Sequence, residues 1–244
     1  MEKILDFVYN VFYEIANVMV MGMIGFILSL FVVSSDTHWQ YYDADLQHHI
    51  FAVKYAIGIE DYYREQIPDE YFDLFWYYTR ECPDLRPDIL AIMKWESGDF
   101  RRSGYGPKNK NGSYDYGFMQ INSYNLKNKW FVQKYGPKDR KYIRNFHDET
   151  IVMGINYYKE MHELYGENAF ACYNGGPKAD RILRSGENAN SRFVKNVSTY
   201  QRYVSSIKKS ILSDIDNISN VIVSECYDLR NIRNSWPSLL ALVK

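Results

Sequence analysis

The spacing of apolar positions changes along the chain, and each spacing predicts a different kind of element. The longest apolar stretch, residues 15–35, contains no charged residue. As a helix, the part from Ile15 to Val33 would span roughly 30 Å, which is about the thickness of the hydrocarbon core of a bilayer. The pattern therefore predicts one transmembrane helix at the start of the chain.

A cleaved signal sequence is the alternative for this stretch. The residues Val33-Ser34-Ser35 could serve as a small-residue cleavage site. However, the leader lacks the basic region that precedes such a signal, since Lys3 is outnumbered by Glu2, Asp6 and Glu14. The lack of a basic region favours an uncleaved membrane anchor, formed by residues 15–35, over a cleaved signal sequence.

Beyond this stretch, apolar residues recur mostly at helical spacing, so the fold class is expected to be mainly α. Strand-like alternation is limited to a short stretch around Tyr116 to Ile121. The expected helices are Asp43 to Gln66, Asp69 to Tyr78, Pro87 to about Ser97, Glu149 to Tyr165 with Asp148 as N-cap, a helix from near Asn168 to the break at Gly175, and about Phe193 to Ile211.

The composition argues against nucleic-acid binding and against a metal site. The 244 residues are 46% hydrophobic, which is ample for a core, and the net charge of −1 gives no reason to expect a nucleic-acid partner. The histidines are scattered and the cysteines lack metal-ligand spacing, so no metal site is expected. Three separate thiols are favoured over a Cys82–Cys226 disulfide, which would leave Cys172 free.

One acidic residue has a position suited to catalysis. Glu96 follows Ile92, Met93 and Trp95 at the end of an apolar helix. Apolar surroundings raise the pKa of a carboxyl group, and a glutamate that stays protonated near neutral pH can act as a general acid. A single helix-end glutamate is usually a solvated surface group, so the neighbouring motifs have to decide its role.

Three motifs in order resemble the lysozyme-like superfamily, in particular the SLT-type lytic transglycosylases and the smaller secretion-associated transglycosylases. They are KWESG from Lys94, GSYDYGFMQINS from Gly112 and ACYNGGP from Ala171. The resemblance extends over about residues 84–207. It implies a lysozyme-like helical catalytic domain, here with extra helices on both sides.

The resemblance also assigns roles to individual residues. Glu96 is implied to be the catalytic acid and base. Asp115 matches the second carboxylate of lysozymes, although it could instead hold its loop by accepting backbone donors. Tyr203 resembles a late tyrosine that approaches the catalytic glutamate, but Tyr200 replaces the threonine expected before it. The implied substrate-binding residues are Ser97, Gly117, Met119, Gln120, Tyr173 and Asn174.

The implied reaction is cleavage of the β-1,4 bond between N-acetylmuramic acid and N-acetylglucosamine in peptidoglycan, with formation of 1,6-anhydromuramic acid ends. No cofactor is expected. One alternative is a hydrolytic muramidase that uses Glu96 and Asp115, in the way that lysozyme uses two carboxylates. Another is an inactive module that binds glycan or scaffolds an envelope machine.

These expectations give a domain plan. Residues 1–35 are an anchor or signal segment, 36–83 a helical extension, 84–207 the catalytic domain and 208–244 a C-terminal helical extension. The expected location is the cell envelope, anchored in the inner membrane with the catalytic domain in the periplasm or outside, or secreted after cleavage. The expected partners are peptidoglycan strands and the membrane; a secretion or flagellar assembly is a further candidate.

Overall fold

The computed structural model describes the backbone of residues 39–185 and 192–241, and the side chains of residues 48–185 and 192–225. It divides into two units, residues 1–53 and residues 54–244. The first unit contributes only the beginning of one helix to the described part. The predicted transmembrane stretch, residues 15–35, lies outside the described residues, and within them no helix is long and apolar enough to cross a membrane.

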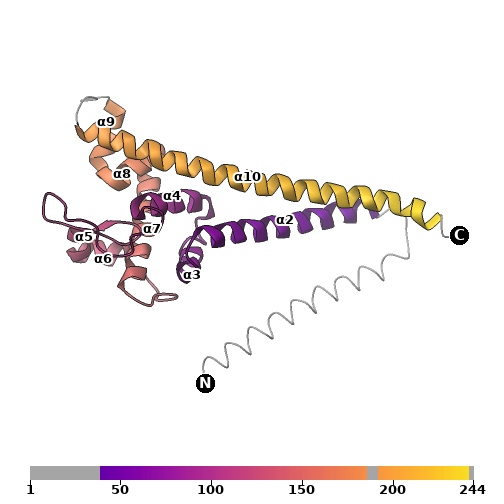
Figure 1. Cartoon of the computed structure of the whole chain (residues 1–244), viewed down its shortest axis with the longest axis horizontal. Helices are drawn as coiled ribbons and strands as arrows, with labels where there is room; N and C mark the ends of the chain where they lie inside the picture. The colour runs from indigo at the N-terminus through magenta and orange to yellow at the C-terminus, as the bar shows by residue number, and fades with distance from the viewer. Residues whose placement is uncertain (1–38, 186–191, 242–244) are drawn as a thin grey trace, which may run out of the picture. The chain divides into compact units, whose positions relative to one another are not determined.

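The described chain is mainly helical, as predicted (Figure 1). Its one sheet is a two-stranded hairpin in which Asp115 pairs with Asn122 and Tyr116 with Ile121. The elements are α2 (Trp39–Gln66), α3 (Asp69–Tyr78), η1 (Pro83–Leu85), α4 (Arg86–Ser97), β1 (Asp115–Tyr116), β2 (Ile121–Asn122), α5 (Ser123–Lys127), α6 (Lys129–Tyr135), α7 (Phe146–Tyr165), η2 (Gly166–Asn168), α8 (Ala169–Gly175), α9 (Pro177–Ser185) and α10 (Arg192–Ala241).

Helix α7 is the centre of the core in residues 54–244. It packs against α3, α6 and α8, and its residues from Ile151 to Ile155 are almost completely buried. Gly154 lets the hairpin segment approach, because a Cβ at this position would overlap the side chain of Met119. The close contact brings the turn between β1 and β2 against the core.

The start of α7 differs from the prediction. The helix begins at Phe146, and the N-cap is Asn145, whose side-chain oxygen accepts the Asp148 backbone N–H at 3.1 Å. The predicted cap, Asp148, is fully buried instead and forms an ion pair with Arg144 at 3.1 Å. An aspartate in the first turn also stabilises a helix N-terminus, which is why the sequence pattern misplaced the cap.

A buried carboxylate ties three helices together. Asp88 of α4 accepts the Tyr158 hydroxyl of α7 at 2.6 Å and forms an ion pair with Lys208 of α10 at 2.6 Å. Because Asp88 is only 3% exposed, both partners are needed to compensate for its loss of water. This contact fixes α10 against α4, the helix that carries Glu96.

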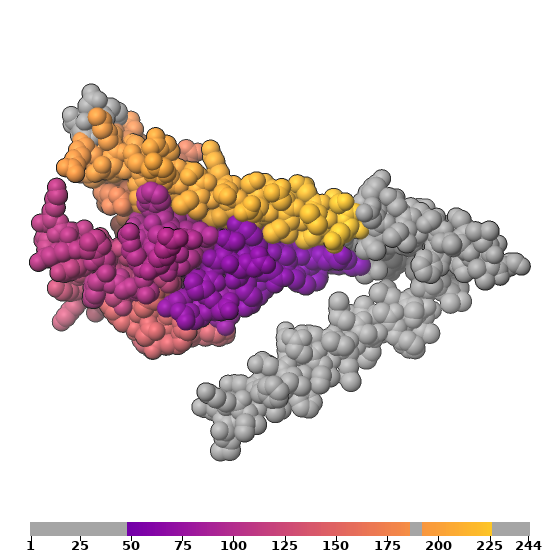
Figure 2. Space-filling view, viewed as in Figure 1, coloured from indigo at the N-terminus to yellow at the C-terminus, as the bar shows by residue number. Residues whose placement is uncertain are grey.

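The extra helices pack onto the same core. Within residues 54–244, α2 and α10 run antiparallel: Tyr62 donates to Asp214 at 3.2 Å, and Lys54 lies 3.5 Å from Glu225. Figure 2 shows the yellow side chains of α10 against the purple ones of α2. Helix α10 is also continuous through residues 207 and 208, where a domain boundary was predicted.

The cysteines that the structure describes are free thiols. Cys82 is half-buried and Cys172 is fully buried. The side chain of Cys226 lies outside the described part. For Cys82, the free thiol agrees with the favoured expectation rather than with the disulfide alternative.

Candidate active site

Glu96 lies in the last turn of α4, where the chain turns sharply toward a polar cleft. The helix ends at Gly98, whose φ of 63° is the left-handed conformation that glycine adopts without strain. The N–H groups of Gly98 and Asp99 donate to the carbonyl groups of Trp95 and Lys94. The turn is therefore held by its own backbone bonds, and the Glu96 carboxyl is left to face the cleft.

The cleft has a volume of about 430 Å³. Its walls are mainly side-chain amides, with two carboxyl groups and two tyrosines among them. The amides and the tyrosine hydroxyls form hydrogen bonds without carrying a net charge, so they suit a neutral ligand rich in hydroxyl and acetamido groups. The lining residues are Glu96, Asn109, Asp115, Gln120, Ile121, Asn122, Asn125, Tyr157, Tyr173, Asn174 and Gly176.

The surroundings of Glu96 favour its protonated form. Burial raises the pKa of Glu96 to about 7, and the negative charge of Asp115 adds to the rise. The Tyr200 hydroxyl, the Arg102 charge and the Asn174 amide act in the opposite direction. A carboxyl group with this pKa can donate a proton near neutral pH and accept one afterwards.

Asp115 is fixed in the cleft by two amides. One of its carboxylate oxygens accepts from the Asn122 side chain at 2.8 Å, and the other accepts from Asn109 at 3.0 Å. Its backbone carbonyl accepts the Gly106 N–H at 2.7 Å. The side chain therefore serves as a rigid anion that also pins the loop before β1 to the hairpin.

The turn between β1 and β2 is shaped by its motif residues. Gly117 has a φ of 76°, and a Cβ there would lie 2.7 Å from the Thr150 hydroxyl oxygen. The Gln120 side-chain amide donates to the Gly117 carbonyl at 2.6 Å, while Gln120 still lines the cleft. Gly117 is thus needed for the backbone conformation of the turn, and it does not line the cleft.

Helix α8 contributes the opposite wall. Tyr173 and Asn174 both line the cleft, and the Tyr173 hydroxyl donates to the Met119 carbonyl at 2.7 Å. Burial raises the pKa of Tyr173 well above its ordinary 10, so the hydroxyl stays neutral and acts as a donor. This bond joins α8 to the hairpin turn and keeps the two walls together.

Two predicted substrate contacts are core residues in the structure. Ser97 is fully buried; its hydroxyl donates to the Met93 carbonyl and accepts the Phe100 N–H, both at 2.6 Å. Met119 is also fully buried, beneath Gly154. Neither side chain lines the cleft, so both hold the site together from behind.

The tyrosine next to Glu96 lies about one helical turn before the predicted one. Tyr203 is 43% exposed and stacks on Trp95, with ring centroids 5.0 Å apart. The tyrosine that faces Glu96 is Tyr200, which is 6% exposed. The Tyr200 hydroxyl has no hydrogen bond of standard geometry among the described residues, so it is a buried donor directed at the carboxyl without a fixed partner.

The prediction therefore placed six of its nine site residues near or in the cleft wall and missed others. Glu96, Asp115, Gln120, Tyr173 and Asn174 line the cleft, and Gly117 shapes its turn. The residues that were not predicted as site residues are Asn109, Ile121, Asn122, Asn125, Tyr157, Gly176 and Tyr200. For Asn109 the only sequence signal was the polar, glycine-rich loop from Phe100 to Asp115.

Comparison with known proteins agrees with this geometry. Residues 85–194 match the family model of the transglycosylase SLT domain. The match starts at the residue before α4 and ends within α10, so it contains every residue that lines the cleft. No curated protein and no solved structure gives a significant match to the chain.

Proposed function

We propose that the SLT transglycosylase domain of this chain cleaves the β-1,4 bond between N-acetylmuramic acid and N-acetylglucosamine, with Glu96 as both acid and base. At the level of the family, an SLT domain implies lytic transglycosylase activity on peptidoglycan. The observation that carries the residue-level proposal is the Glu96 carboxyl, whose pKa of about 7 is set in a cleft lined by amides.

In the first step, protonated Glu96 gives its proton to the glycosidic oxygen. The bond from this oxygen to C1 of the muramoyl residue breaks, and positive charge develops at C1. The Asp115 carboxylate in the same cleft stabilises that charge electrostatically. Glu96 is left as a carboxylate, in the state needed for the next step.

In the second step, Glu96 takes the proton of the C6 hydroxyl of the same muramoyl residue. The C6 oxygen then bonds to C1, which closes the 1,6-anhydro ring and restores the proton on Glu96. No water is consumed. A pKa near the working pH suits a group that must donate and then accept within one turnover.

The fixed position of Asp115 supports the transglycosylase over a covalent mechanism. Both of its carboxylate oxygens already accept amide N–H groups, from Asn109 and Asn122. These charge-assisted bonds hold the carboxylate in place and stabilise its negative charge, which lowers the nucleophilicity of both oxygens. We therefore assign Asp115 an electrostatic and positioning role.

A hydrolytic muramidase is the second candidate function, and the observation that favours it is the presence of two carboxyl groups in one cleft. An inactive glycan-binding module is disfavoured, because Glu96 lies in the cleft wall with a raised pKa rather than on open surface. The substrate also suggests where the enzyme works: we propose that the domain faces the cell wall.

The test is cleavage of purified peptidoglycan by the wild-type chain and by Glu96→Gln. The amide keeps the size of the side chain but cannot donate and accept the proton, so soluble products should fall by at least about 100-fold. The matched control is Glu65→Gln, which changes an exposed glutamate of α2. Equal activity of Glu96→Gln and the wild type would refute the assignment of Glu96.

A further inference from the structure

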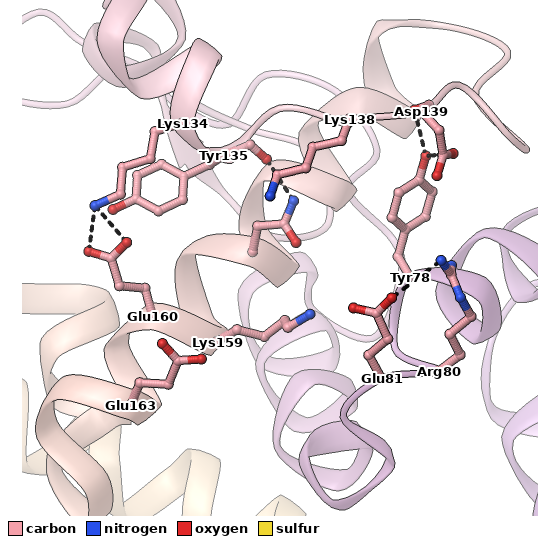
Figure 3. Close-up of a pocket in the computed structure, with 11 residues that line it drawn as sticks. Tyr78, Arg80, Glu81, Lys134, Tyr135, Lys138, Asp139, Lys159, Glu160 and Glu163 are labelled. Atoms are coloured by element: carbon pink, nitrogen blue, oxygen red, sulfur yellow. Dashed lines mark hydrogen bonds and ion pairs between the residues drawn. The ribbon is translucent and has the colours of Figure 1, made fainter.

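A second pocket lies along α7, the helix that also contributes Tyr157 to the cleft. It has a volume of about 310 Å³, at the lower end of the range for ligand pockets, and lies between the end of α3, the segment after α6 and the middle of α7 (Figure 3). It is lined by Tyr78, Arg80, Glu81, Lys134, Tyr135, Lys138, Asp139, Asn156, Lys159, Glu160 and Glu163.

Some of the charges in this pocket are already neutralised. Lys134 forms an ion pair with Glu160 at 2.6 Å, and Arg80 lies 3.5 Å from Glu81. Asp139 accepts hydrogen bonds from the hydroxyl groups of Tyr77 and Tyr78. These contacts form the rim and hold the walls of the pocket in place.

Two ammonium groups are left over. Lys138 and Lys159 come from different elements, and Figure 3 shows both side chains extending toward the middle of the pocket. Within the described part of the chain, neither lysine forms an ion pair, and the same holds for Glu163. Among the described residues, the pocket thus has two cations without an ion-pair partner and, beside them, the carboxylate of Glu163 and that of Glu81, whose one ion pair is the 3.5 Å contact with Arg80.

Such a pocket is complementary to a group that carries both charges. A carboxylate of the ligand would form charge-assisted hydrogen bonds with the two lysine ammonium groups. An ammonium group of the same ligand would bind the glutamate carboxylates of the pocket. A purely anionic ligand would face Glu81 and Glu163, and a purely cationic ligand would face the two lysines. An amino-acid end with free amino and carboxyl groups satisfies both sides.

The charged pocket and the cleft share a wall. Tyr157 lines the cleft and the preceding residue, Asn156, lines the charged pocket. The rings of Tyr157 and Tyr135 are in contact across this wall, with centroids 5.2 Å apart. The Asn156 side chain donates to the Tyr135 carbonyl at 2.9 Å, which fixes the end of α6 on α7. The cleft and the charged pocket are therefore neighbours, separated by these two packed rings.

We propose that the charged pocket binds the zwitterionic amino-acid end of a peptide attached to the glycan strand. Lys138 and Lys159 bind its carboxylate, and Glu81 and Glu163 bind its ammonium group. The inference rests on the proposed function, because peptidoglycan is a glycan whose muramoyl residues carry short peptides. It makes the enzyme selective for strands that still have their peptides.

The test compares two substrates with the full chain: glycan strands bearing their peptides, and the same strands after the peptides have been removed. In the double variant Lys138→Ala/Lys159→Ala, kcat/KM on peptide-bearing strands should fall about tenfold through a higher KM, which corresponds to ~1.4 kcal/mol. The value on stripped strands should not change. The control Lys209→Ala removes an exposed lysine of α10 outside the pocket.

An equal loss on both substrates would overturn the proposal, because it would indicate damage to the cleft or the fold. No loss on either substrate would also overturn it.

A second measurement keeps the inference independent of cleavage. A free stem tripeptide ending in diaminopimelate is titrated into the full chain and followed by NMR shifts of Asn156 and Lys159. Saturable shifts that disappear in the double variant, or when the free amino and carboxyl groups on the diaminopimelate side chain are blocked, would support the pocket even if the wild type cleaves nothing. The absence of saturable shifts in the wild type would refute it.

Discussion

Glu96→Gln is expected to stabilise the protein at alkaline pH while it abolishes activity. The folded protein raises the pKa of Glu96 from its ordinary 4.5 to about 7, mainly through burial. Between these two values the folded state keeps a proton that the unfolded state has released. Stability due to this group therefore falls as the pH rises through this range, and above pH 7 the full cost is present.

The magnitude follows from the difference of about 2.5 pH units between the two pKa values. At 1.36 kcal/mol per unit, ionised Glu96 costs the folded state about 3 kcal/mol above pH 7 and nothing below pH 4.5. A glutamine carries no charge at any pH. The stability of Glu96→Gln relative to the wild type should thus increase by about 3 kcal/mol between pH 4 and pH 8.

The assay is urea unfolding of both proteins at several pH values from 4 to 8. With a slope of about 3 kcal/mol per molar urea, the midpoint of the variant should move about 1 M further from that of the wild type over this range. Glu65→Gln, at an exposed glutamate, serves as the control and should show no such trend. A difference between Glu96→Gln and the wild type that stays constant with pH would refute the reasoning.

Four further substitutions test the surroundings of Glu96 and the packing of the hairpin. Tyr200→Phe removes a hydroxyl that lowers the pKa of Glu96, so the alkaline limb of the activity profile should move to higher pH. Tyr203→Phe should leave it in place, and a shift in Tyr203→Phe alone would restore the original assignment. Asp115→Asn removes a charge that raises the pKa of Glu96, so this limb should move to lower pH; an upward shift would contradict the electrostatic role. Gly154→Ala should destabilise the fold by about 1–3 kcal/mol in urea unfolding, because its Cβ overlaps Met119. Wild-type stability for this variant would mean that the hairpin is not packed as described.

The sequence predicted the helices well because apolar spacing and local breakers report on them directly. Helix α3 has the predicted bounds, Asp69 to Tyr78, and α4 starts one residue before the predicted Pro87. The predicted N-cap of α7 was wrong, because Asn145 and Asp148 are both favourable residues at the start of a helix. Only tertiary packing, which buries Asp148 beside Arg144, decides between them.

From the sequence, the motifs predicted which residues belong to the site but not what each side chain does there. A motif cannot say whether a residue contributes its side chain or its packing, and so Ser97 and Met119 were expected at the substrate although both are buried. Similarly, Tyr200 and Tyr203 are nearly one turn apart on α10. Which of the two tyrosines faces Glu96 depends on how α10 is rotated against α4. That rotation is set by long-range contacts such as the ion pair between Lys208 and Asp88.

The charged pocket had no sequence signal. The two lysines that form no ion pair among the described residues come from a loop and from α7. The acidic residues come from the segment before the first catalytic motif and from the stretch between the second and third motifs. Charged residues at such spacing normally indicate solvated surface. Their convergence in one cavity results from the packing of α3, α6 and α7.

The most direct measurement for the central claim is mass spectrometry of the fragments released from peptidoglycan in water enriched in ¹⁸O. If Glu96 directs the C6 hydroxyl to C1, the new muramoyl ends are 1,6-anhydro rings, lighter than reducing ends by one water and free of ¹⁸O. Reducing ends that carry ¹⁸O would show that water attacks C1, and would contradict the account.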